Sequence, residues 1–167
     1  MPDFGQAREF PTDVHGREVP FLANMRERIA CKLYCRAPEL ELARDFVGTA
    51  LDVFALGVVF FTLLVGARPF DEATWRQGSA YHTLVVQGDG GGGGGGGGSG
   101  GGAAIVRLAR TLCRNPLCLV CRDVTETGSC RMHTAAADLI FNCIALPSHR
   151  FTMQRVLEHA WLSSPPV

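Results

Sequence analysis

A run of apolar residues dominates the middle of the chain. Between Val53 and Val65 only Gly57 and Thr62 interrupt it, so the segment has no polar face for water. Such a pattern predicts a core helix against which the rest of the fold packs. At about 13 residues, the apolar centre is shorter than the length needed to span a bilayer.

Capping signals mark both ends of this helix. Thr49 stands three residues before Asp52, a spacing at which the two side chains can cap the first turn. Gly66 follows the apolar run, and Pro69 comes soon after it. Glycine takes the left-handed conformation that ends helices and proline cannot continue one, so we expect the helix to end here.

Two flanking segments also show helical periodicity. One buried face is predicted for Tyr81, Leu84 and Val85. Residues 103–114 predict an amphipathic helix with an apolar stripe at Ile105, Leu108, Ala109, Leu112 and Cys113. Its opposite face carries Arg107, Arg110 and Arg114, which we interpret as a solvated surface and not as a phosphate site.

The end of the chain predicts two more helices. The first has a buried stripe formed by Ala136, Leu139, Ile140, Cys143 and Ile144. The second is expected to bury Met153, Val156, Leu157 and Ala160. We therefore predict a mainly α fold around one central hydrophobic helix.

Composition narrows the classes of partner. Of the 167 residues, 16 are Lys or Arg and 16 are Asp or Glu, so no excess charge favours nucleic acid or an anionic membrane. The first ten residues lack the apolar core of a secretory signal, and seven cysteines, an odd number, are typical of reduced thiols. We expect a cytoplasmic protein without a membrane segment.

Several motifs occur in the order found in protein kinases. Asp3-Phe4-Gly5 and Ala37-Pro38-Glu39 are separated as at the two ends of a kinase activation segment, and Asp52-Val-Phe-Ala-Leu-Gly57 with its apolar run resembles the central helix that follows. Phe151 to Leu162 resembles the last helix of the domain. The chain thus resembles a truncated C-terminal lobe of a eukaryotic Ser/Thr protein kinase.

The resemblance implies roles for particular residues. Asp3 would hold the Mg²⁺ of Mg-ATP if further segments completed the site, and Phe4 and Gly5 would support it. Glu39 would pair with a buried Arg150, and Asp52 would lie under the catalytic loop. No catalytic-loop motif occurs in this sequence, so we expect a solvated Asp52 and no catalytic residue.

Other kinase features depart from the family pattern. Ala30 and Cys31 replace the usual Gly and Thr of the substrate-docking loop, and one extra residue separates Tyr34 from Ala37. The glycine-rich lid is missing, and the single lysine, Lys32, belongs to the docking loop. Phosphoryl transfer depends on such positioning groups, so we expect this chain alone to be inactive.

A glycine-rich and a cysteine-rich stretch divide the kinase-like regions. We expect kinase-like parts at residues 1–89 and 135–167, a disordered polyglycine linker at 90–102 and a Cys-rich insert at 103–134. Two close pairs in the insert have the spacing of a structural Zn²⁺ site: Cys118, Cys121, Cys130 and His133.

Three functions remain open from the sequence. The chain is a fragment of an ATP-dependent Ser/Thr kinase, a non-catalytic interaction module, or a zinc-binding adaptor. Apolar residues around the central helix would lack the covering that a catalytic loop provides. We therefore expect self-association or a protein partner.

Overall fold

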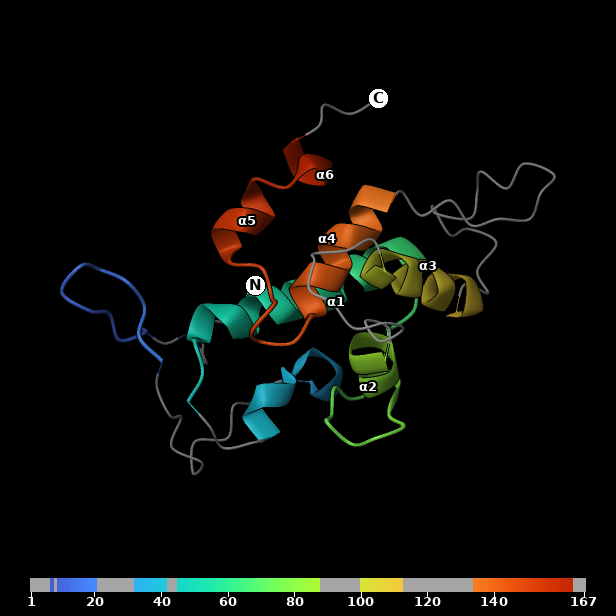
Figure 1. Cartoon of the computed structure of the whole chain (residues 1–167), viewed down its shortest axis with the longest axis horizontal. Helices are drawn as coiled ribbons and strands as arrows, with labels where there is room; N and C mark the ends of the chain where they lie inside the picture. Colours follow the sequence, from blue (N-terminus) through green and yellow to red (C-terminus); the bar gives the residue numbers. More distant parts are fainter. Residues whose placement is uncertain are drawn as a thin grey trace.

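The computed structural model describes residues 7, 9–20, 32–41, 45–87, 100–112 and 134–163. Within these ranges the fold is helical, and the only β-type pairing is an isolated bridge between Thr12 and Glu18. The helices form a bundle in which α4 lies across α1 with α3 beside it (Figure 1). The prediction of a mainly α fold is confirmed.

The described elements follow in chain order. Two short 3-10 helices come first: η1 (Leu33–Cys35) and η2 (Pro38–Glu41). The central helix α1 (Gly48–Val65) is followed by a loop. After the loop, α2 (Ala80–His82) continues directly into η3 (Thr83–Gln87), which is π-helical. The remaining helices are α3 (Gly100–Leu112), α4 (Thr134–Ile144), α5 (Met153–Leu157) and α6 (Ala160–Ser163).

Helix α1 ends as expected but begins differently. Gly66 takes a left-handed conformation with φ 76° and donates its N–H to the Thr62 carbonyl, 2.8 Å away. At the start, Val47 is the N-cap and provides no side-chain cap. The predicted Thr49–Asp52 capping pair is wrong, because the Glu18 carboxylate accepts both the Thr49 N–H (3.0 Å) and the Thr49 hydroxyl (2.6 Å).

The length of α1 also corrects the sequence estimate. With 18 residues it is about 27 Å long, and by length and composition alone it could cross a membrane. Seven of its residues are buried against other parts of the chain. The core helix of a soluble protein passes the same length and composition test, so α1 alone is weak evidence for a membrane span.

The central packing contact is between α1 and α4. Gly57 is buried, and its missing side chain lets α1 approach Cys143 and Ile144 of α4 closely. All five residues of the predicted α4 stripe are buried. Helix α3 adds Ile105 and Ala109 to the same core.

A cluster of aromatic rings packs around Tyr81, next to α1. Tyr81 is fully buried and contacts the rings of Phe54, Phe70 and Trp75 at centroid distances of 6.0, 5.5 and 6.1 Å. Its hydroxyl donates to the Ile144 carbonyl at 3.2 Å. Burial raises the pKa of the Tyr81 phenol far above its ordinary value. The predicted buried face of this segment, including Leu84 and Val85, is confirmed.

The buried face predicted for the last helix is wrong for three of its four residues. Val156 is buried, whereas Met153 and Ala160 are exposed and 63% of Leu157 is exposed. The physical reason is the length of α5. A helix of five residues makes little more than one turn, so only Val156 reaches the cluster formed by α1 and α4. His159, in the turn before α6, instead ties this end to α4 through Asp138, with 3.1 Å between Nε2 and Oδ2.

Helix α3 begins earlier than the sequence indicates. Its first turn contains Gly100 and Gly102, so these glycines belong to a helix and not to the predicted disordered linker. The predicted amphipathic helix is confirmed up to Leu112, since Ile105 and Ala109 are buried while Arg107 is exposed. The predicted Cys113 and Arg114 lie outside the described residues. Packing against α4 supplies the free energy that glycine does not contribute to helix formation.

We expect the buried Cys143 to be chemically inert in the folded chain. Burial raises the pKa of its thiol from 9.0 to about 12, so the reactive thiolate is scarce at pH 8.5. Maleimide labelling followed by peptide mass spectrometry should modify the half-buried Cys35 much faster than Cys143. Native labelling of both thiols at the same rate would contradict the packing of α4.

The same pKa shift predicts how alkali affects stability. In the unfolded chain the thiol of Cys143 ionises near pH 9, whereas in the folded chain it stays protonated until about pH 12. The unfolded state alone therefore loses this proton as pH rises above 9, and the free energy of unfolding falls across that interval. Cys143→Ala should reduce this part of the alkaline slope in urea titrations.

Candidate functional site

A buried ion pair joins three distant parts of the chain. Arg150 and Glu39 are 7% and 6% exposed, and the guanidinium donates to both carboxylate oxygens. The Nη2 to Oε2 distance is 3.0 Å. Arg150 Nη1 also donates to the Ala50 carbonyl of α1 at 2.9 Å, and Nε donates to the Ala145 carbonyl at 3.2 Å. The resemblance to a kinase lobe implied this pair, and the structure brings its two members together.

Local backbone structure aims Arg150 at its partners. After α4, the N–H groups of His149 and Arg150 both bond to the Leu146 carbonyl, at 2.9 and 2.8 Å, and form a tight turn. The turn directs the guanidinium inward over the Phe54 ring, whose centroid is 5.1 Å away. This contact adds a cation–π attraction to the charge-assisted hydrogen bonds.

The loop that follows α1 bonds to the residues on either side of Glu39. Glu39 lies in η2, and the indole N–H of Trp75 donates to the Pro38 carbonyl at 2.8 Å. Thr74 donates its hydroxyl to Glu41 at 3.0 Å. Residues 38–41, at the end of the segment that resembles a kinase docking loop, are therefore held both by Arg150 and by the loop after α1.

Asp52 lies on the outside of α1. Its side chain is exposed, as expected for a solvated carboxylate. Partial burial by its neighbours raises the pKa of Asp52, and the negative charge of Glu18 raises it further. Because the charged form is disfavoured, this carboxylate adds no stability to the fold at neutral pH.

The remaining predicted site residues lie outside the described ranges. These are the three residues of the activation-segment start, Asp3, Phe4 and Gly5, and the zinc candidates Cys118, Cys121, Cys130 and His133. Among the described residues no three His, Cys, Asp or Glu side chains come together as a metal site would require. The Mg²⁺ and Zn²⁺ assignments stay predictions.

Sequence reasoning missed two polar contacts that organise the fold. Glu18 caps α1 from 31 residues away, and Asp138 holds His159 from 21 residues away. The Trp161 N–H donates to His159 Nδ1 at 3.2 Å, so Nε2 carries the proton that points to Asp138. No local pattern marks such pairs, because each depends on tertiary packing.

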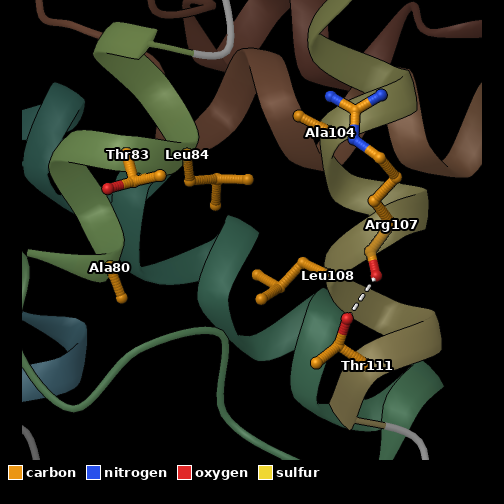
Figure 2. A pocket seen from close by; sticks show the side chains of 7 residues that line it. All are labelled: Ala80, Thr83, Leu84, Ala104, Arg107, Leu108 and Thr111. Atoms are coloured by element: carbon orange, nitrogen blue, oxygen red, sulfur yellow. Dashed lines mark hydrogen bonds between the residues drawn. The ribbon is translucent and has the colours of Figure 1, made fainter.

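A shallow pocket between α2–η3 and α3 has a volume of about 490 Å³. Leu84 and Leu108 extend toward each other from its two walls (Figure 2). The Thr111 hydroxyl is used within α3, where it donates to the Arg107 carbonyl at 3.1 Å. The other lining residues are Ala80, Thr83 and Ala104. The pocket is mainly apolar and assembles no acid–base pair.

Comparison with known proteins agrees with this architecture. Serine/threonine-protein kinase ppk16 of Schizosaccharomyces pombe is 40% identical over 72 residues, which are 43% of this chain and 10% of that protein. Protein kinase kin1 of the same yeast is 38% identical over 64 residues, 38% of this chain and 7% of the relative. A probable serine/threonine-protein kinase KIN1 homolog of Enterocytozoon bieneusi is 48% identical over 40 residues, 24% of this chain and 7% of the relative.

Each of these matches therefore spans a tenth or less of the relative's own length. The sequence model of the protein kinase domain covers much more of this chain, from residue 1 to residue 162. That range includes η2 with Glu39, the central helix α1, and the turn that carries Arg150. The chain belongs to the protein kinase domain family.

Proposed function

We propose that this chain is the structural core of a Ser/Thr kinase C-terminal lobe and that it does not transfer phosphate by itself. In an intact kinase the same elements would support ATP-dependent phosphorylation of protein Ser or Thr residues. The observation that carries this proposal is the Glu39–Arg150 pair. It joins the docking-loop segment to the helical core, which is a positioning role and not a chemical one.

The distribution of charged groups supports an inactive chain. Transfer of the γ-phosphoryl group needs a lysine on the phosphates, Mg²⁺ ligands and a base beside the attacking hydroxyl. Lys32 is exposed just before η1, and the described ranges contain no strand that could present it to a nucleotide. Asp52 and Glu18 lie at the start of α1, where Glu18 is occupied by Thr49.

ATP and Mg²⁺ enter the proposal only through segments that complete the lobe. In that case Asp3 would be the metal ligand, and this chain's own contribution would be to hold the docking segment in place. Removal of preorganised groups costs orders of magnitude in rate, so a partial site gives no measurable turnover. A cytoplasmic location fits this function and is proposed with it.

A phosphate-transfer assay tests the proposal. Purified chain would be incubated with Mg²⁺, γ-labelled ATP and myelin basic protein, alongside an Asp3→Asn variant. We expect both proteins to give only background label in the substrate and in themselves. Label that is incorporated by the wild-type chain and lost in Asp3→Asn would refute an inactive core and show that the chain completes its own nucleotide site.

A non-catalytic interaction module is the second candidate function. It is favoured by the apolar side chains that α1 leaves exposed at Val59 and Leu63. Such a module would act through binding and would not need ATP.

A further inference from the structure

His159 uses both nitrogens of its ring to join α4 to α6. It lies between α5 and α6, and only 13% of its side chain is exposed. Nε2 lies 3.1 Å from Oδ2 of Asp138 on α4, and Nδ1 accepts the backbone N–H of Trp161 on α6 at 3.2 Å. His159 is therefore the N-cap of α6, because its side chain accepts the N–H of the second helical residue.

This cap depends on the protonation state of His159. A neutral imidazole has one N–H and one acceptor, and here Nε2 carries the hydrogen while Nδ1 accepts. A protonated imidazole has an N–H on both nitrogens and no acceptor. Nδ1 and the Trp161 nitrogen would then place two N–H groups opposite each other at 3.2 Å. Protonation of His159 therefore abolishes the cap of α6.

The contact with Asp138 responds in the opposite direction. Nε2 donates to this carboxylate in both protonation states, and a positive charge on the ring strengthens the hydrogen bond. Asp138 is held in place by Asn142, whose side-chain amide donates to Oδ1 at 3.2 Å. The Asp138 side chain is 48% exposed, so protons from solvent reach the pair. Protonated His159 thus stays attached to α4 while it releases α6.

The other titratable and charged side chains on the surrounding elements do not bond to the His159 ring. In the described part of the chain they are Asp52 on α1, Arg155 on α5, and His149, Arg150 and Glu158 in the adjoining turns. Arg150 pairs with Glu39, and the Arg155 guanidinium lies over the Phe151 ring. Helix α6 has no charged residue. Asp138 is therefore the group that favours proton uptake by His159, in the pH range where histidines titrate.

Release of α6 changes the surface of α1. Trp161 is half-buried against Phe60 of α1, with the ring planes at 80° and the centroids 5.7 Å apart. Helix α6 has four residues, and a helix this short does not form in water without its cap and its tertiary contacts. Loss of the cap therefore frees Trp161 from Phe60 and exposes both rings.

We propose that His159 is a pH-dependent switch that controls the packing of α6. At about pH 8 the neutral ring caps α6 and holds Trp161 on α1. At about pH 5 the protonated ring remains paired with Asp138, α6 separates, and Phe60 becomes accessible. Helices α1 and α4 keep their own close contact at Gly57, so the change is confined to the end of the described chain.

Fluorine NMR on the full chain tests the proposal. The chain contains two tryptophans, Trp75 and Trp161, so incorporation of 5-fluorotryptophan gives two signals, which Trp75→Phe assigns. Between about pH 8 and about pH 5 we expect the Trp161 signal to shift with a single midpoint and the Trp75 signal to stay in place. The isotope shift of the Trp161 signal between H2O and D2O should increase at the lower pH, because it reports the exposure of the ring to solvent.

Three variants identify the group that titrates. Asparagine is a good N-cap and does not titrate, so His159→Asn should fold like the wild type and show no pH-dependent shift of Trp161. Asp138→Asn removes the charge but keeps an acceptor for Nε2, so the midpoint should fall by about 0.5–1 pH unit. His149→Asn is the matched control, since His149 is exposed and its ring contacts Ser148, and it should leave the response unchanged.

Three outcomes would overturn the proposal. The first is a Trp161 signal that does not move across this pH range, or that moves equally in His159→Asn. The second is a Trp161 shift without a larger isotope effect, which would mean that a nearby charge changes while α6 stays packed. The third is a change in the Trp75 signal together with a loss of helical circular dichroism, which would mean that the whole chain unfolds.

Discussion

Glu39→Ala should destabilise the chain by about 3–5 kcal/mol, because it leaves the guanidinium of Arg150 buried without its counter-charge. Only 1% of the Arg150 side chain is exposed, so water cannot replace the lost carboxylate. The carbonyls of Ala50 and Ala145 still accept hydrogen bonds, but they do not neutralise the charge. Urea unfolding followed by tryptophan fluorescence would measure the change.

Asp71→Ala is the matched control for this prediction. Asp71 also pairs with an arginine, Arg68, at 3.5 Å, but its side chain is 95% exposed. Exposed pairs contribute little because water and salt screen them, so this variant should unfold close to the wild type. Equal losses in Glu39→Ala and Asp71→Ala would mean that burial does not determine the strength of the Glu39–Arg150 pair.

The double variant Glu39→Met/Arg150→Met tests whether the loss of stability comes from an unpaired buried charge or from a change in the backbone of the docking segment. Replacement of a buried pair by apolar side chains is often tolerated, because the cost of desolvating two charges disappears with them. The double variant should therefore be more stable than Glu39→Ala. A double variant that is as unstable as the single one would show that the pair also fixes the backbone of the docking segment.

Periodicity predicted the helices that bury a complete stripe. The α4 stripe and the buried face around Tyr81 were readable from the sequence because each side chain there repeats at helical spacing and packs in the core. The same reasoning failed for Leu157, since α5 is too short for periodicity to determine burial. It also failed for Val59 and Leu63, because an apolar run does not reveal which of its sides is covered.

The candidate site was predictable only where a family resemblance supplied the pairing. Glu39 and Arg150 are 111 residues apart, and no local rule connects them. Glu18 and Thr49 are 31 residues apart without such a guide, and their contact was missed. Thr49 did signal a helix start, but its cap came from a loop and not from the residue three positions later.

The close approach of α1 and α4 makes Gly57 the second position at which we expect a substitution to cause a large loss of stability. Gly57→Ala should destabilise the chain by about 1–2 kcal/mol, although alanine favours a helix over glycine by about 1 kcal/mol. A Cβ at this position would lie 2.6 Å from Cβ of Cys143 and 2.8 Å from Cγ2 of Ile144. The Cβ of Cys143 is fixed to its backbone, so the two helices must separate.

Gly102→Ala provides the matched control and should have the opposite sign. A Cβ at Gly102 would meet its nearest neighbour, the Asp138 nitrogen, at an ordinary 3.6 Å. The helix preference of alanine then acts without a clash, and the free energy of unfolding should rise by about 0.5–1 kcal/mol. Urea titrations of both variants would measure the difference. Stabilisation by Gly57→Ala would show that α1 and α4 are farther apart than described, and that the core does not depend on this glycine.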